Sequence, residues 1–298
     1  MTLYAAGEGA PTEVSRTKTD AKERFHFDAT SAPKDSVLYA VAKGPNQAVA
    51  LMTLLGTSFP NTITVNELTT VASTFTAARF INGEAICGNP LGLRIAAGNT
   101  PNLVDLEAGG WGKVIVDPGN STWTTALANL NTLGSLISAF ATVANDDWRT
   151  RFLQAATSIG GATPKNTLEA MAAIARTPWA NPKVLYALFD EAYPQPKDGA
   201  RRKAPFAPYL AYAPADFILS LWFGGGGSYS NGNMVFDSEG NMWCGVNWMA
   251  GSQSGVRKNI GGGLIKFSPN GTALSPPITG FTGMGVDGIG WGTSRDTR

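Results

Sequence analysis

Oxygen-bearing side chains gather in a short segment near the C-terminus, where they could hold a divalent cation. Asp237, Glu239 and Asn241 alternate along the chain, and carboxylate and amide oxygens are the ligands that hard cations such as Ca²⁺ take. Asp and Asn also favour tight turns, because their side chains accept hydrogen bonds from the nearby backbone. The spacing therefore predicts a turn between two strands first, and a metal site as the alternative.

Aromatic residues are dense in the same part of the chain and could form a ligand-binding surface. Exposed rings stack on sugars or on apolar ligands, whereas buried rings fill the core of a small β domain. Both interpretations stay open from the sequence. The candidate ligand-binding residues are Trp222, Tyr229, Trp243, Trp248 and Trp291.

Groups suited to nucleophilic or acid–base catalysis are few. The one histidine, His26, lies between Phe25 and Phe27, and this alternation predicts that it faces solvent from a strand. Cys87 and Cys244 are far apart and have no CxxC partner, which excludes a structural zinc site and a thioredoxin-type motif. They are expected to be free thiols, and a disulfide between them stays open. The sequence predicts no catalytic residue.

The composition excludes two further classes of protein. Lys+Arg 23 against Asp+Glu 22 gives a net charge of +1, so no general attraction for nucleic acid is expected. With 43% hydrophobic and 15% charged residues, the 298-residue chain has enough apolar material for a folded core. No run of about 18 apolar residues and no export leader is found, so the sequence predicts neither a membrane span nor a signal peptide.

The N-terminal part of the chain predicts a small antiparallel, sandwich-like β unit over residues 1–43. Two of its four strand-like runs, Arg24–Asp28 and Ser36–Val41, alternate polar with apolar residues. Turn-forming residues separate the runs, as a meander of strands requires.

Residues 44–193 carry repeated helix-start signals and predict an α-helical domain. Thr64 and Glu67 are spaced as a capping box, ahead of apolar residues at helical spacing. Longer helices are expected at 122–143 and 147–157. Four further starts are predicted where a side-chain acceptor precedes a proline: Asn89-Pro90, Thr100-Pro101, Thr163-Pro164 and Asn181-Pro182.

The last third of the chain predicts a linker followed by β structure. Prolines and the triplet Arg201-Arg202-Lys203 predict a solvated linker over residues 194–216. Residues 217–298 predict two hairpins that turn at Ser238–Gly240 and Ser268–Gly271. Two hairpins in series make one four-stranded blade. The expected fold class is thus α+β and multi-domain: a β unit, a helical domain and a propeller-like blade.

Two segments of the blade resemble a known repeat. Phe236-Asp237-Ser238-Glu239-Gly240-Asn241-Met242-Trp243 and Gly263-Leu264-Ile265-Lys266-Phe267-Ser268-Pro269-Asn270-Gly271 are similar to the blade repeat of NHL-type β-propellers, especially the streptogramin lyase (virginiamycin B lyase)-like ones. The region upstream resembles the part that precedes such propellers in large bacterial envelope proteins. The resemblance implies a secreted or cell-envelope location and, in the lyases, a metal-assisted elimination that uses a histidine.

This chain departs from the family pattern, because it contains one blade and no histidine within it. A propeller closes with several blades, so an incomplete propeller from a larger protein is expected. The favoured hypothesis is a non-enzymatic binding, adhesion or scaffold protein without a cofactor, whose partner is a carbohydrate or another envelope protein. One alternative is an incomplete lyase-like enzyme that uses a divalent cation. The other is a homo-oligomer that forms through exposed blade edges.

Overall fold

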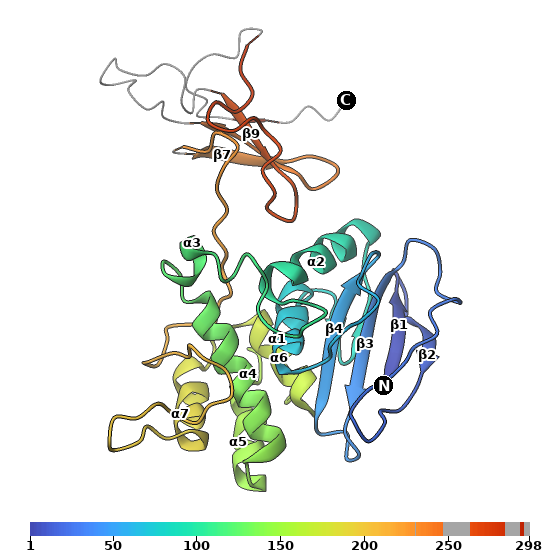
Figure 1. Ribbon diagram of the computed structural model, residues 1–298, viewed down its shortest axis with the longest axis vertical. Coiled ribbons are helices and arrows are strands. Elements are labelled where there is room, and N and C mark those ends of the chain that lie inside the picture. Colours follow the sequence, from blue (N-terminus) through green and yellow to red (C-terminus); the bar gives the residue numbers. More distant parts are fainter. Residues whose placement is uncertain (230, 247–262, 284–292, 295–298) are drawn as a thin grey trace. The chain divides into compact units, whose positions relative to one another are not determined.

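The computed structural model describes residues 1–229, 231–246, 263–283 and 293–294 (Figure 1). It divides into two compact units, Met1–Leu221 and Trp222–Arg298. Helices and antiparallel sheets are both present, which confirms the α+β class. The strands of the described ranges form open sheets and no closed barrel or propeller. The first unit takes in three of the expected segments, residues 1–43, 44–193 and 194–216.

The first unit begins with an antiparallel sheet of order β2-β1-β3-β4 (Figure 1). Two expectations for this region are wrong. The run Arg24–Asp28 is a loop, although Phe25 and Phe27 are half-buried and His26 is exposed, as their alternation predicted. Conversely, a strand extends the sheet within the range that was expected to be helical. The strands are β1 (Thr2–Ala6), β2 (Thr12–Arg16), β3 (Val37–Lys43) and β4 (Ala50–Gly56).

Both faces of this sheet are covered, but not by a second sheet as in a sandwich. One face, which includes Tyr39 and Met52, packs on α2 (Pro90–Leu103) and α6 (Thr167–Arg176). The other face, which includes Leu3 and Leu38, packs under loop residues such as Phe27 and Ile63. Burial on both sides explains why β3 and β4 show little alternation in sequence.

A second core surrounds α4 (Ala126–Thr142), the longest helix of the described ranges, which contacts α1 (Glu67–Thr76) and α7 (Pro182–Ala192). α5 (Asp146–Ala155) packs on α7, and its Trp148 and Phe152 rings stack with centroids 5.4 Å apart. A short helix, α3 (Pro118–Ser121), and a two-stranded ribbon, β5 (Ile81–Asn82) with β6 (Ala85–Ile86), complete the unit.

The helix-start predictions held in some places and failed in others. α2 begins at Pro90, with the Asn89 side chain as its N-cap, and α7 begins at Pro182. Pro101 lies inside α2, so the expected start at Thr100 is wrong. α6 begins at Thr167 and is capped by Asn166, three residues after the expected position. α1 does have a capping box, but it joins Asn66 and Thr69 rather than Thr64 and Glu67.

Hydroxyl groups close the outer edge of β4. β4 is the last strand of its sheet, so alternate N–H and C=O groups point away from β3. Thr167 Oγ1 accepts from the N–H of Ala50 at 2.9 Å and donates to its C=O at 2.6 Å. On α1, Thr70 Oγ1 and Ser73 Oγ accept from two more edge amides at 2.9 and 2.8 Å. Those two amides belong to Met52 and Leu54.

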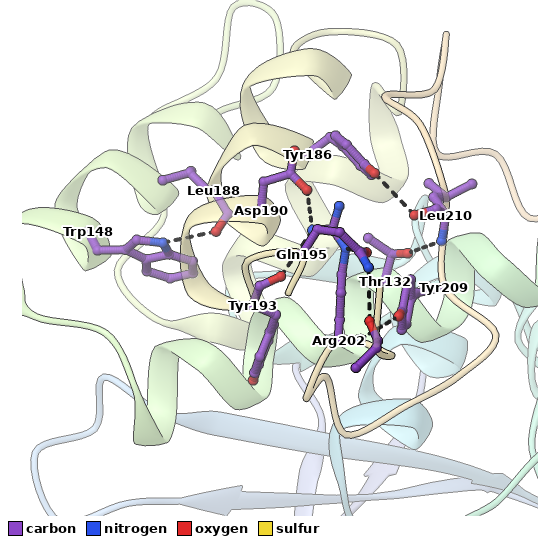
Figure 2. A network of polar contacts seen from close by, with 11 residues as sticks. Thr132, Trp148, Tyr186, Leu188, Asp190, Tyr193, Gln195, Arg202, Tyr209 and Leu210 are labelled. Atoms are coloured by element: carbon purple, nitrogen blue, oxygen red, sulfur yellow. Dashed lines mark hydrogen bonds and ion pairs between the residues drawn. The ribbon is translucent and has the colours of Figure 1, made fainter. Parts of the chain in front are cut away.

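The proline-rich segment 194–216 packs on the helices, so the expectation that its charges keep it solvated is wrong for Arg202. The Arg202 side chain is only 9% exposed and forms an ion pair with Asp190. It also donates to Tyr193 O at 3.0 Å (Figure 2). Its guanidinium lies over the Phe189 ring, 5.4 Å from the centroid. Further along, Leu210 donates from its N–H to Thr132 Oγ1 at 3.0 Å (Figure 2). Phe217 is fully buried.

The second unit contains a three-stranded antiparallel sheet of order β7-β8-β9. Its strands are β7 (Asn231–Phe236), β8 (Met242–Val246) and β9 (Leu264–Phe267). The two expected hairpins are present in outline, but the fourth strand is reduced to an isolated bridge between Phe267 and Ala273. Within the described ranges of the chain, no helix is long and apolar enough to cross a membrane.

Candidate functional site

The sheet of the second unit has one apolar face, which is covered unevenly. Its register places Met234, Cys244 and Ile265 side by side, so these side chains share a face. Cys244 and Ile265 are buried within a cluster that Phe223 helps to cover, whereas Met234 is 56% exposed. The apolar face is therefore closed over β8 and β9 and open over β7.

The backbone of β7 is open at the same place. The N–H of Asp237 donates to Asn241 O at 3.0 Å, so this residue pair is hydrogen-bonded across the hairpin. Because hydrogen-bonded and non-hydrogen-bonded positions alternate in an antiparallel ladder, the N–H and C=O groups of Met234 and Phe236 point away from β8. β7 is an edge strand among the described residues, and Phe236 is 62% exposed. The exposed apolar side chains and the outward-facing backbone groups that strand addition needs therefore belong to the same residues of β7.

The predicted turn residues hold this hairpin in place. Asp237 accepts hydrogen bonds from the N–H groups of Glu239 at 3.0 Å and of Asn241 at 2.9 Å. Its second carboxylate oxygen accepts from Asn241 Nδ2 and from Trp243 Nε1, both at 2.9 Å. These donors, Trp243 first, hold the pKa of Asp237 well below its usual range. Gly240 adopts φ +81°, which an Asp-x-x-Gly turn needs and L residues rarely adopt.

The three predicted metal ligands come together, but as a hydrogen-bonded turn. Asn241 Nδ2 lies 3.2 Å from Glu239 Oε2 as well as close to Asp237, so a donor nitrogen faces both carboxylates. Lys266 Nζ lies 3.8 Å from Asp237 Oδ2 and occupies the cationic position beside it. Across the described residues, no group of three or more His, Cys, Asp or Glu side chains is placed to hold a metal ion.

The predicted aromatic residues have different surroundings. Trp243 is engaged inside the unit, because Lys266 Nζ lies 4.7 Å from its ring centroid and the Phe281 ring stacks at 5.9 Å. Trp222 is 54% exposed and Tyr229 is 37% exposed. Trp248 and Trp291 fall outside the described residues. The structure therefore joins Trp243 to the turn at Asp237 and leaves the proposed aromatic surface as a prediction.

The groups with the greatest intrinsic reactivity are His26 and Cys87 in the first unit and Cys244, which is buried in the sheet of the second. His26 is exposed in a loop of the first unit. Cys87 and Cys244 are both free thiols, and burial raises the pKa of Cys244. A thiol with a raised pKa is a poor nucleophile at neutral pH. Cys244 therefore acts as a small apolar residue in the core of its sheet.

Sequence reasoning treated Met234 and Phe236 as ordinary strand residues and so missed them as a surface. The signal that was present is the pair of large apolar side chains two positions apart on a strand with no charged residue. Which side of the sheet stays open depends on strand order, and a sequence does not state strand order.

The comparisons with known proteins add no relative. No protein-family model, no curated protein and no solved structure matches this chain.

Proposed function

We propose that this chain is a non-enzymatic scaffold protein of the bacterial envelope that associates through the β7 edge of its C-terminal sheet. The open apolar edge, with Met234 56% and Phe236 62% exposed, carries the proposal. The envelope location and the interpretation of the sheet as part of a propeller-like blade rest on the resemblance of its hairpins to NHL repeats.

The occupant that fits this edge is β7 of a second copy. The strand Asn231–Phe236 contains no charged residue, so two antiparallel copies bring no like charges together. Pairing about Met234 places Phe236 opposite Gly232 of the other copy, where the missing side chain leaves room for the ring. The apolar rows of the two copies then join on one face, which is how strand addition gains specificity.

The contact is short, which sets its strength. A bulge between Asn231 and Met234 interrupts regular pairing with β8, and bulges limit edge pairing. The contact is therefore limited to the few residues around Met234, with Gly232 lying at the bulge. Interfaces of this size fall in the weak class, and we expect dissociation constants on the order of 100 μM.

Light scattering after size-exclusion chromatography tests the proposal on the full chain at a series of concentrations. We expect a concentration-dependent dimer that the double variant Met234→Lys/Phe236→Lys weakens at least tenfold. Ile159→Lys, which replaces a 70% exposed side chain of the first unit, is the matched control and should leave association unchanged. A strict monomer at all concentrations, or a dimer that the β7 variant leaves intact, would contradict self-association. Loss of binding to a different envelope protein in that variant would transfer the role to a hetero-partner.

A further inference from the structure

A second surface, independent of the sheet edge, lies on the helical part of the first unit. Two adjoining troughs of about 340 and 330 Å³ run along α7, and both include Asn181 and Val184. The first trough lies between α5 and α7, which pack side by side (Figure 1). The second is walled by Trp179 and by Pro214 of the proline-rich segment. Volumes of about 300–1,000 Å³ are usual for small-molecule sites.

Exposed aromatic rings mark the second trough. Trp179 is 56% exposed although it belongs to the tight connection between α6 and α7. Tyr212, 84% exposed, is two residues from Pro214 and hence within about 7 Å of it along the backbone. Contact of two large apolar rings with water beside one trough is unfavourable in free energy. A ligand that stacks on the rings would remove them from water.

The first trough offers planar hydrogen-bonding groups that are already held in place. Arg151 donates to Glu191 Oε2 at 2.9 Å and to Oε1 at 2.7 Å, and its Nε donates to Asp147 at 2.8 Å. These bonds use three of the five guanidinium N–H groups and fix the plane of the others. Gln154 lies exposed on the same wall. At the floor of this trough, Asn181 links the start of α7 to the end of α5, because its Nδ2 donates to Ala155 O at 3.0 Å.

The charges of the troughs favour a neutral ligand. In the first trough Arg151 is paired with the two carboxylates Glu191 and Asp147, and Lys183 lines the second trough, so these four formal charges sum to zero. A phosphate or carboxylate ligand is held best by several cations together, whereas Lys183 is a single cation beside the Arg151 ion pairs. A hydroxyl-rich ring satisfies all these features at once, because its C–H face stacks on an indole and its hydroxyls reach fixed planar donors and acceptors.

We propose that these joined troughs bind a neutral oligosaccharide, with Trp179 as the stacking platform and the Arg151–Glu191 pair and Gln154 as hydroxyl partners. All the residues of this site belong to the first unit, whereas β7 and the predicted aromatic residues belong to the second.

Titration calorimetry on the full chain tests this inference, with chitohexaose, cellohexaose and maltohexaose as neutral probes and hexagalacturonate as an anionic one. We expect at least one neutral probe to bind in the millimolar range or tighter at probe concentrations up to about 5 mM. Trp179→Ala should weaken that binding about tenfold, as the loss of one aromatic stacking contact implies. Trp179→Phe should retain most of it, and Gln154→Ala should weaken it by a smaller factor.

Trp123→Ala is the matched control, since it removes a 77% exposed indole of the same unit outside the troughs. No binding of any neutral probe would overturn the proposal, as would binding of hexagalacturonate alone. Binding that survives Trp179→Ala but is lost in Trp222→Ala would place the saccharide on the second unit and would also overturn it.

Discussion

The edge strands β4 and β7 differ in whether their outer backbone groups have hydrogen-bond partners among the described residues. The outer amides of β4 are satisfied by Thr70, Ser73 and Thr167 at 2.8–2.9 Å, and the strand is buried. The outer groups of β7 point away from their own sheet, next to side chains that are more than half exposed. An unpaired edge is a template for another strand, and proteins normally cover, charge or shorten it. The first unit covers the β4 edge, whereas among the described residues of the second unit Met234–Phe236 stay uncovered.

The covered edge also shows what closure demands of the sequence. Two residues along a strand advance about 6.6 Å, whereas three residues along a helix advance about 4.5 Å. Side chains of a single helix therefore cannot stay level with successive outward-facing amides of the strand. Hydroxyls of α1 accept only from the amides of Met52 and Leu54. The third amide, that of Ala50, is served from α6 by Thr167. Among the described residues of the second unit, no helix supplies such hydroxyl groups to β7.

Amide hydrogen exchange measures the comparison directly and should show the largest difference. We expect the amides of Ala50, Met52 and Leu54 to exchange on the order of a thousandfold more slowly than those of Met234 and Phe236 in dilute protein. Exchange at Met234 should slow as the protein concentration rises, because pairing with a second copy protects it. Equal protection at both edges in dilute solution would contradict the distinction.

Replacing the edge hydroxyl that makes two bonds should produce the next largest effect. Thr167→Val keeps the shape of the side chain but leaves the buried N–H and C=O of Ala50 without their partner. An unsatisfied buried group costs about 1–3 kcal/mol, so urea unfolding followed by circular dichroism should show a loss in that range. Thr142→Val, an exposed position whose hydroxyl bonds only within its own helix, is the control. A loss below about 0.5 kcal/mol, the usual size of a surface effect, would mean that the hydroxyl is not needed to close the edge.

Local signals allowed the sequence to predict some parts of this structure well. The Asn89-Pro90 start of α2 and the turn from Asp237 to Asn241 each depend on residues within four positions of one another. Their hydrogen bonds form inside a single turn, so composition and spacing suffice to anticipate them.

Long-range packing decided the parts that were predicted wrongly. β4 lacks alternation because both of its faces are buried, and its neighbour α6 is more than a hundred residues away in sequence. Pro101 stays within α2, where the buried Thr100 and Leu103 hold the helix on the core. Arg202 leaves solvent because Asp190 and two aromatic rings surround it. At the candidate site, the turn followed from spacing, whereas the openness of β7 followed from strand order.

The pH dependence of the Asp237 turn should give the smallest effect and sharpen the picture of how β7 is held. The pKa of Asp237 is lowered in the folded state, chiefly by the hydrogen bond from Trp243. The ionised carboxylate therefore stabilises the hairpin above the unfolded pKa of about 3.9, and this contribution is lost as the pH falls through the folded pKa. The indole N–H resonance of Trp243 reports on the bond. We expect Asp237→Asn to destabilise the hairpin at pH 7 and the difference from wild type to shrink below about pH 4.

Glu239→Gln is the matched control for this turn, since Glu239 Oε2 contacts only Asn241 Nδ2, at 3.2 Å, among its described side-chain bonds. It should change the pH profile little. If the hairpin of Asp237→Asn is as stable as that of the wild type at pH 7, the turn does not depend on the charge of the carboxylate. The turn would then no longer be an alternative explanation to cation binding by Asp237. If the hairpin loosens and self-association falls with it, the turn positions the β7 edge, and the open edge depends on a locally encoded hydrogen-bonded turn.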